Sequence, residues 1–247
     1  MEYALAYEEV RIAVGRKVLV DGLTLRIPAR GVFGIVGANG AGKSTLVLAA
    51  LGLRRAQAGR IVVLGRPLAA WRPRELALRV GYVPQQLESH WDLTVAELLH
   101  LAPAPPSADL VAECELQALL SRRFNTLSGG ERARAAVARA LAHRPALLLA
   151  DEPAAHLDVP HQHHLMRLLR ARARDTAVVI VVHDLHLAQR YCDRVALVAR
   201  GRLARVGTPE EVLEDASLGE AYGQPIARIV SGGHAFFTLG PDRPDTR

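Results

Sequence analysis

The chain has 247 residues, of which 50% are hydrophobic and 23% charged. These values exclude a disordered chain and allow one large core with at most a small appended piece. The net charge of +6 would fit a nucleic-acid partner. However, the basic residues are scattered without a dense run, so we expect no nucleic-acid binding. A basic surface beside anionic lipid headgroups explains the charge equally well.

We expect the chain to lie in the cytosol, because its sequence shows no targeting segment and few cysteines. No apolar run approaches the length of a membrane span, and the first residues lack the basic-then-apolar layout of a signal peptide. The two cysteines, Cys114 and Cys192, are too few for a disulfide framework. They indicate free thiols or small core residues.

Apolar patterning predicts strands and helices in alternation. The predicted strands cover residues 4–10, 18–20, 23–27, 31–36, 61–64, 80–84, 146–150 and 177–182, followed by a hairpin of 195–199 with 203–206. The predicted helices cover residues 46–51, 95–101, 110–120, 129–142, 161–174, 185–191 and 209–213. Continuous apolar strands such as 146–150 are typical of parallel sheets covered on both faces. We therefore predict an α/β fold with a mainly parallel sheet.

Residues 88–126 differ in character from the rest of the chain. Three prolines, at positions 103, 105 and 106, interrupt stretches with helical patterning. We interpret this region as a mostly helical insertion. The last residues of the chain are polar and contain proline, so we expect them to fray.

A glycine-rich motif gives the first functional signal. Gly37-Ala38-Asn39-Gly40-Ala41-Gly42-Lys43-Ser44-Thr45 fits the P-loop pattern G-x-x-x-x-G-K-[ST] and lies between a predicted strand and a predicted helix. Glycines let backbone N–H groups close around a phosphate chain at a helix N-terminus. Lys43 can then reach the β- and γ-phosphates, and the Ser44 hydroxyl can ligate Mg²⁺. The alternative, a chance glycine-rich turn, is disfavoured by the correct flanks.

Two further motifs carry groups that suit the same chemistry. Asp151 and Glu152 follow the strand 146–150, at the edge where a parallel sheet places its ligands. Asp151 can hold Mg²⁺ and Glu152 can polarise a water. If the chain had no P-loop, an ordinary acidic turn after the strand would be the preferred interpretation of these two residues. Leu127-Ser128-Gly129-Gly130-Glu131 opens a predicted helix and offers a second anion-binding helix end.

Together these motifs resemble the ATP-binding cassette (ABC) ATPases, whose signature is the pentapeptide at 127–131. The resemblance covers nearly the whole chain. In the family's order it includes the P-loop at 37–45, Gln85, the signature, Asp151-Glu152, Leu157-Asp158 and His183. It implies a P-loop NTPase core with an N-terminal antiparallel β subdomain and a short α-helical subdomain. The implied nucleotide-binding domain covers 1–207, with the helical part inserted at about 88–145, and 208–247 form an accessory extension.

The resemblance also implies roles for individual residues. Two copies would face each other head to tail, with each ATP between the P-loop of one copy and Ser128, Gly129 and Gly130 of the other. The implied catalytic residues are Lys43, Gln85, Glu152 and His183, and the implied Mg²⁺ ligands are Ser44, Gln85 and Asp151. The implied nucleotide contacts are Gly37, Asn39, Gly40, Ala41, Gly42, Lys43, Ser44, Thr45, Ser128, Gly129, Gly130 and Asp158. Gln85 would also sense the membrane partner, His183 would contact the γ-phosphate, and Asp158 would communicate across the dimer.

Within the family, the chain resembles the importers of iron–siderophore, haem and cobalamin. Residues 184–194, 207–213 and 221–223 carry this resemblance. It implies an ATP-hydrolysing subunit at the cytoplasmic face of the inner membrane, working with a separate permease and, indirectly, a solute-binding protein. The alternatives are another ABC importer, an exporter of lipids or drugs, a soluble ABC protein acting on DNA or ribosomes, and a P-loop kinase. The presence of a single cassette disfavours the soluble ABC protein. The signature pentapeptide disfavours the kinase, which would have no use for it.

The chain departs from the family pattern at four places. Val14 stands where an aromatic residue usually stacks on adenine, and Tyr7, the nearest aromatic upstream, is out of register. Ala38 replaces the usual proline of the P-loop, and Arg132 replaces the usual glutamine after the signature. The span from 93 to 127 is shorter than in most siderophore-importing relatives. The loss of base stacking predicts weak discrimination of adenine.

Overall fold

The structure is a computed structural model that describes residues 2–85, 92–155, 157–231 and 234–240. Its strands are β1 (Tyr3–Val14), β2 (Lys17–Pro28), β3 (Val32–Val36), β4 (Ala58–Val63), β5 (Arg66–Pro67), β6 (Val80–Val83), β7 (Leu147–Asp151), β8 (Ala177–Val181), β9 (Arg194–Ala199), β10 (Arg202–Gly207), β11 (Ile226–Ser231) and β12 (His234–Leu239). Its α-helices are α1 (Lys43–Ala50), α2 (Pro73–Ala77), α3 (Val95–His100), α4 (Ala108–Glu113), α5 (Gly129–Leu141), α6 (Val159–Arg172), α7 (Leu185–Tyr191), α8 (Pro209–Val212) and α9 (Asp215–Tyr222). Short 3₁₀ helices cover Leu68–Ala70, Gln117–Leu119 and Phe124–Thr126.

A mainly parallel sheet forms the centre of the molecule, as the apolar runs predict. Its strand order is β10-β9-β3-β8-β7-β6, and only the edge pairing of β10 with β9 is antiparallel. Every residue of β3, β7 and β8 is buried, because helices cover both faces of the sheet. The loops after β3, β7 and β8 therefore meet at one edge, which is where parallel sheets bind ligands.

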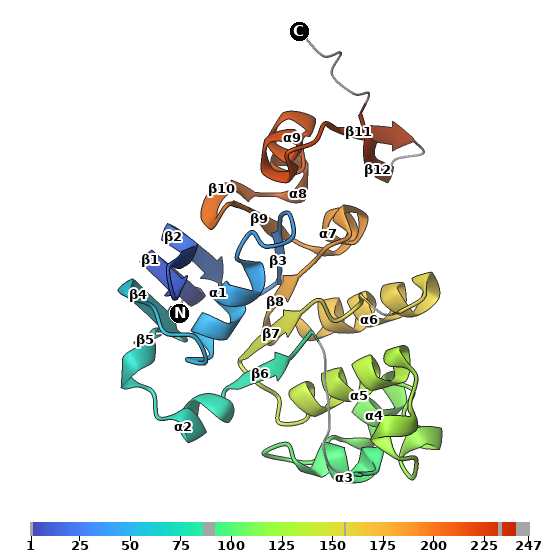
Figure 1. Cartoon of the computed structure of the whole chain (residues 1–247). Coiled ribbons are helices and arrows are strands. Elements are labelled where there is room, and N and C mark those ends of the chain that lie inside the picture. Colours follow the sequence, from blue (N-terminus) through green and yellow to red (C-terminus); the bar gives the residue numbers. More distant parts are fainter. Residues whose placement is uncertain (1, 86–91, 156, 232–233, 241–247) are drawn as a thin grey trace, which may run out of the picture.

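An antiparallel sheet with the order β2-β1-β4-β5 lies beside the central sheet, and α1 packs between the two (Figure 1). Tyr7 of β1 is fully buried, and its hydroxyl donates a 2.8 Å hydrogen bond to the backbone oxygen of Leu46 in α1. Tyr7 is therefore a core residue that joins the sheet to the P-loop helix, which agrees with its being out of register for adenine.

A small helical region contains α3, α4 and α5 and lies at one end of the molecule (Figure 1). The prediction of one helix over 110–120 is wrong, because α4 ends at Glu113. Glu115 has a left-handed backbone conformation, with φ of 53°, which interrupts the helix. The turn buries the Cys114 and Leu116 side chains, so core packing outweighs helix propensity here.

The C-terminal part holds more structure than the sequence predicted. The helix predicted at 209–213 is α8, but α9 and the antiparallel hairpin of β11 with β12 were not predicted. The polar residues 241–247 that were expected to fray lie outside the described residues.

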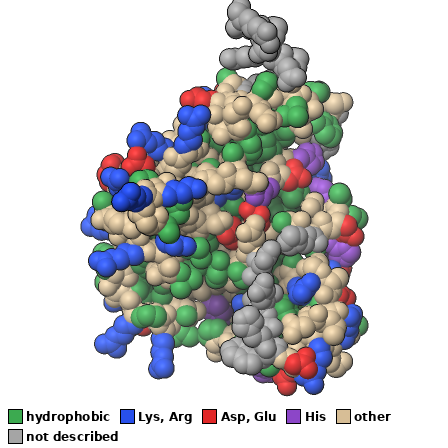
Figure 2. Space-filling view, in the orientation of Figure 1, with side chains coloured by type: hydrophobic (Ala, Val, Ile, Leu, Met, Phe, Trp, Pro, Cys, Tyr) green, Lys and Arg blue, Asp and Glu red, His purple; other side chains and the backbone are tan. Residues whose placement is uncertain are grey.

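The cysteines and the surface agree with the expectations from composition. Cys114 and Cys192 are free and buried, and burial raises the pKa of each thiol to about 12. Lys and Arg side chains are spread over the visible face rather than gathered in one block (Figure 2). Within the described residues, no helix has the length and apolarity needed to span a bilayer.

Candidate nucleotide-binding site

The loop after β3 is a glycine-dependent turn. Gly37 has φ of 146°, and a Cβ at this position would lie 2.0 Å from the backbone oxygen of Val198 in β9. Gly42 has φ of 105°, and a Cβ there would lie 2.6 Å from the backbone oxygen of Leu19. Only glycine fits such positions. The loop is thus pressed between β9 and β2, which fixes its shape before any ligand arrives.

The remaining P-loop residues follow the path expected for a phosphate cradle. Asn39 and Gly40 are exposed at the tip, whereas Ala41 is buried beneath it. The helix α1 begins at Lys43 rather than at Leu46 as predicted, so Lys43, Ser44 and Thr45 form its first turn. The first N–H groups of a helix have no partner within the helix and point toward a ligand at its N-terminus.

The Lys43 side chain lies folded inside the loop and is only 5% exposed. Its Nζ donates to the backbone oxygens of Gly37, at 2.8 Å, and Ala38, at 3.0 Å. Burial lowers the pKa of the ammonium, and the nearby carboxylates of Glu152 and Asp151 oppose this shift. The charge is held at the centre of the loop, where it can neutralise a phosphate.

Ser44 and Asp151 form a pair of oxygen donors across the site. The Ser44 hydroxyl donates a 3.0 Å hydrogen bond to Asp151 Oδ1, although the two residues are 107 positions apart. Asp151 ends β7 and is only 3% exposed. Burial raises the pKa of its carboxyl, and the Ser44 hydrogen bond partly offsets this. A hydroxyl and a buried carboxylate are hard oxygen ligands, which Mg²⁺ prefers.

Glu152 lies between two other predicted site residues. Gln85 Nε2 donates to Glu152 Oε2 at 2.8 Å, and His183 Nε2 lies 2.6 Å from Glu152 Oε1. The three residues follow β6, β7 and β8, which are neighbours in the sheet. Glu152 has φ of 52°, a left-handed conformation that non-glycine residues rarely adopt. Its side chain is only 9% exposed. The structure therefore brings together the carboxylate, amide and imidazole that the motif order had placed in one site.

The signature residues form a second group. Ser128 caps α5: its hydroxyl accepts from the N–H of Glu131 at 3.2 Å, and Glu131 Oε2 accepts from the N–H of Ser128 at 2.7 Å. The Ser128 N–H lowers the pKa of the Glu131 carboxyl. The helix α5 lies in the helical region, well apart from α1 (Figure 1). Ser128, Gly129 and Gly130 are therefore not brought to the P-loop of their own chain.

Asp158 lies with the signature group and not with the P-loop. It caps α6, accepting from the N–H of His161 at 3.1 Å, and the hydrogen bonds from His161 lower the pKa of its carboxyl. The preceding Leu157 packs against the signature, since a Cβ on Gly130 would lie 3.0 Å from Leu157 Cδ2. The Leu157-Asp158 motif thus adjoins the signature, and Ser128 and Asp158 are the exposed residues of this group.

Val14, the expected neighbour of adenine, ends β1 and is 47% exposed. It pairs with Lys17 across a turn made by Gly15 and Arg16. Tyr222 lies at the end of α9, within the stretch 221–223, and burial raises the pKa of its phenol.

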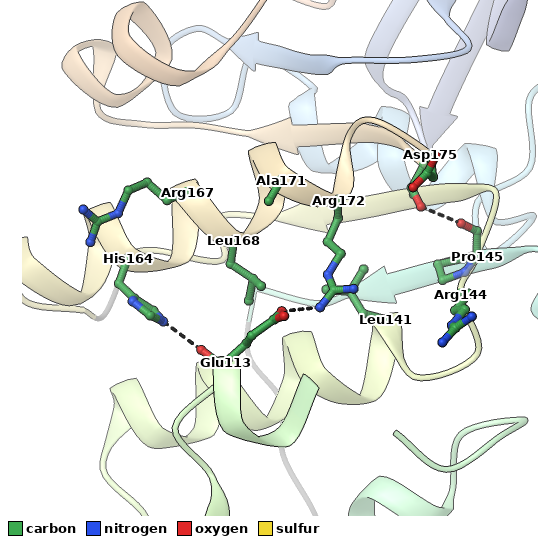
Figure 3. A pocket seen from close by; sticks show the side chains of 11 residues that line it. Glu113, Leu141, Arg144, Pro145, His164, Arg167, Leu168, Ala171, Arg172 and Asp175 are labelled. Carbon is green, nitrogen blue, oxygen red and sulfur yellow. Dashed lines mark hydrogen bonds and ion pairs between the residues drawn. The ribbon is translucent and has the colours of Figure 1, made fainter. Parts of the chain in front are cut away.

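Several cavities formed by described residues lie outside the phosphate-binding loop, and two of them adjoin elements that carry motif residues. One of about 220 Å³ lies behind Glu152 and His183, lined mainly by apolar side chains such as Met166, Val182 and Leu187. The other, of about 640 Å³, lies between the helical region and α6 (Figure 3). Beside it Glu113 of α4 is joined to α6 by an ion pair with Arg172 and by a 2.8 Å contact of its backbone oxygen with His164 Nε2. This second cavity is part of the junction that holds the helical region on the core.

The family profile described as "ABC transporter" matches residues 20–155. This segment contains the P-loop, Gln85, the signature, Asp151 and Glu152. His183 lies beyond it.

Curated relatives match over most of the chain. "Hemin import ATP-binding protein HmuV" of Streptomyces coelicolor is 43% identical, over 88% of this chain and 82% of its own. The proteins of the same name from Thermobifida fusca and Rhodococcus jostii are 40% and 38% identical, over 88% and 91% of this chain and 81% and 82% of theirs.

Solved structures share the fold. An inward-facing metal-chelate type ABC transporter matches with a TM-score of 0.79 and 23% identity, over 97% of this chain and 98% of its own. A bacterial Atm1-family ABC exporter with ATP bound matches with a TM-score of 0.79 and 24% identity, over 86% of this chain and 40% of its own. The agreement of motif geometry, family profile and relatives establishes that this chain belongs to the ABC transporter family, as one of its ATP-binding, ATP-hydrolysing proteins.

Proposed function

We propose that this chain drives the uptake of haem or a related metal chelate through a separate membrane permease. The observation that carries the proposal is the similarity over most of the chain to relatives named as hemin import ATP-binding proteins, at 43%, 40% and 38% identity. A solute-binding protein would act on the permease and reach this chain only indirectly. In this role the chain lies at the cytoplasmic face of the inner membrane.

The chemistry is transfer of the γ-phosphoryl group of ATP to water. Lys43 neutralises charge on the β- and γ-phosphates from inside the loop. Glu152 accepts the proton of the attacking water at its carboxylate, while ADP leaves. Gln85 and His183, which hold the Glu152 carboxylate at 2.8 Å and 2.6 Å, orient the water and the γ-phosphate. Their convergence on one carboxylate supports these roles.

The donor set of the site fits Mg²⁺. Ser44 Oγ and Asp151 Oδ1 lie 3.0 Å apart, and the Gln85 amide is carried by the neighbouring loop. These residues would hold the ion. When bound, it supplies neutralisation of the phosphate oxygens.

A second copy of the chain completes the site. Ser128, Gly129 and Gly130 open α5 with their N–H groups at the helix N-terminus, far from the P-loop of the same chain. In a head-to-tail pair this helix end reaches the γ-phosphate of the partner's nucleotide, where developing negative charge needs donors. Asp158, packed beside the signature, relays between the two copies. The nucleotide-binding domain in this arrangement covers 1–207, with the helical part at 88–145, and 208–247 form the extension.

The test is to recover the tagged chain from gently solubilised host membranes and identify its partners by mass spectrometry. The expected partner is a permease with many spans, and ATPase activity of that complex should rise when haem and the solute-binding protein are added. Recovery of an exporter with its own translocation pathway for lipids or drugs would contradict import. Recovery of ribosomal or DNA-bound proteins alone would leave the ATPase but overturn transport.

A further inference from the structure

The turn that joins β7 to α6 begins with Glu152 and ends with the Leu157-Asp158 motif. Backbone hydrogen bonds shape it. The Glu152 N–H donates to the Val181 oxygen of β8 at 3.2 Å, which ties the turn to the central sheet. The Glu152 oxygen accepts from the Ala155 N–H at 3.2 Å, and the Ala154 oxygen accepts from the Leu157 N–H at 3.2 Å. Two overlapping turns thus connect the two motifs.

The backbone at Glu152 needs support from its surroundings. Its φ of 52° is left-handed, and a residue other than glycine keeps such a conformation only where neighbouring contacts hold it there. The cavity of about 220 Å³ lies against this turn and is lined by Ala154, Met166 and Leu187 among others. Atoms that line a cavity have fewer packing neighbours and so gain less dispersion energy. The conformation at Glu152 therefore depends strongly on the hydrogen bonds of the turn.

One side chain of α6 supplies such a bond. Gln162 Nε2 donates to the Ala154 oxygen at 3.2 Å from a partly buried position, and Gln162 lines the same cavity. The Ala154 oxygen therefore accepts two hydrogen bonds, one from the Leu157 N–H and one from Gln162. No other side chain of the described residues donates to the backbone of this turn. Gln162 thus fastens the turn to a helix.

The helix that carries Gln162 is a rigid support. Leu165, Met166 and Leu169 bury its inner face in the core. Its first turn also holds the other end of the segment, because the His161 N–H donates to Asp158 Oδ1 at 3.1 Å. Adjacent residues of α6 therefore hold the turn at two points. If the bond from Gln162 were lost, the backbone could relax at Glu152, and its carboxylate would change direction.

We propose that Gln162 is a positioning residue for ATP hydrolysis, which holds the turn after Glu152 so that the carboxylate keeps the direction in which Gln85 and His183 contact it. The proposal rests on the role proposed above for Glu152. Gln162 acts through the backbone of Ala154 and touches no reacting atom in this role. An efficient general base requires such fixed geometry, since a small misplacement of a catalytic group lowers the rate strongly.

The experiment compares two variants, Gln162→Met and Gln162→Leu, with the wild type. Methionine is unbranched like glutamine but has no N–H donor, and leucine removes the donor with a different shape. Gln189→Met is the control, because Gln189 is also half-buried on a helix and its Nε2 donates one hydrogen bond, at 2.7 Å to Glu210 Oε1. Steady-state ATPase kinetics, affinity for a fluorescent Mg-ATP analogue and thermal unfolding are measured on the full-length chains.

Both Gln162 variants are expected to lower kcat about three- to tenfold, as the loss of one hydrogen bond predicts. Their KM and dissociation constants should change less than about twofold, because the P-loop keeps its contacts. Gln189→Met should keep the kcat of the wild type. Unchanged kcat in either Gln162 variant, a loss of nucleotide affinity instead of kcat, or an equal fall of kcat in the control would each overturn the proposal.

A double variant tests whether Gln162 acts through Glu152. Single-turnover hydrolysis by Glu152→Gln is compared with that by the same variant carrying Gln162→Met. The two rates should be equal, because a residue that acts only by orienting the base has no further effect once the base is gone. An additional three- to tenfold loss would overturn the proposal. Normal turnover of Glu152→Gln alone would overturn the role of Glu152 itself. Slow turnover of Glu152→Gln with normal Gln162 variants would overturn this proposal alone.

Discussion

His183 Nε2 lies 2.6 Å from Glu152 Oε1, and the two residues come from turns that follow adjacent strands of the central sheet. The imidazole N–H can donate to the carboxylate, so the contact fixes the direction of the Glu152 side chain. Gln85 holds the other oxygen, at 2.8 Å. Because both of its oxygens are held, the carboxylate is oriented before a water molecule binds. Such positioning increases the efficiency of a general base, which accepts the proton of that water.

Replacing Glu152 with Gln is expected to lower kcat for ATP hydrolysis at least about 100-fold, since general bases contribute about 10²–10⁴ to rate. The amide keeps the shape and the contact with His183, so ATP affinity should remain near that of the wild type. The nucleotide-bound dimer should then accumulate, which light scattering or size-exclusion chromatography with ATP would detect. Glu75→Gln, at a half-exposed residue of α2, is the control and should turn over normally. Undiminished turnover in Glu152→Gln would remove Glu152 from this role.

The chain contains only two lysines, which gives a matched pair of variants. Lys43→Ala removes the buried ammonium that the P-loop carbonyls hold, whereas Lys17→Ala removes an exposed one at the start of β2. Charged hydrogen bonds contribute about 1.5–3 kcal/mol, so Lys43→Ala should weaken ATP binding about 10- to 100-fold. Lys17→Ala should bind ATP as the wild type does. Titration with a fluorescent nucleotide measures both, and equal affinities would show that Lys43 does not bind phosphate.

A comparison of variants at Ser128 and Ser107 can distinguish a role of the signature serine in ATP hydrolysis from its role in capping a helix. Each serine caps a helix by accepting from the N–H three residues later, at 3.2 Å in both cases. Replacement of either by Ala should cost about 1 kcal/mol of unfolding free energy. Only Ser128→Ala is expected to lower ATPase activity, because only Ser128 lies at the helix end that we propose to face a second copy. Equal activities of the two variants, at equal stability, would leave Ser128 with a capping role alone.

The same capping box predicts a pH dependence of stability. The Ser128 N–H donates to Glu131 and holds the pKa of that carboxyl below its ordinary value of 4.5. A lowered folded-state pKa means that the stabilisation is present above the unfolded-state pKa and is lost as pH falls through the folded-state pKa. Glu131→Gln should therefore be less stable than the wild type at pH 7, and the difference should shrink below about pH 4.5. Urea unfolding across that range measures it, and a difference independent of pH would show that the charge of Glu131 contributes nothing.

Sequence patterns predicted the fold and the site to different extents. The apolar runs at 146–150 and 177–182 correspond closely to β7 and β8, because strands buried on both faces leave few polar positions. The grouping of Gln85, Glu152 and His183 came from the order of motifs, while the individual contacts with Glu152 did not. Strand adjacency supplies those contacts, and no local pattern encodes it. The end of α4 and the β11–β12 hairpin were missed because tertiary contacts, such as His186 on Phe236, determine them.

The last prediction concerns the surface at the end of β1. Val14 is 47% exposed, and no aromatic side chain stands at this position. Tyr7 cannot replace it, because its ring is fully buried and its hydroxyl is bound to Leu46. Stacking of a base on an aromatic ring contributes about 1–3 kcal/mol. Val14→Tyr is therefore expected to tighten ATP binding by about fivefold or more.

A control for Val14→Tyr is available on the adjacent strand. Val18 pairs with Ala13, is 40% exposed and has no expected contact with adenine. Val18→Tyr should leave ATP affinity unchanged. Stacking is not specific to adenine, since every base has a face on which to stack, so Val14→Tyr should tighten the binding of GTP as well as that of ATP. A variant Val14→Tyr that binds neither nucleotide more tightly than the wild type would show that position 14 does not meet the base, whereas tighter binding of both nucleotides would place it there.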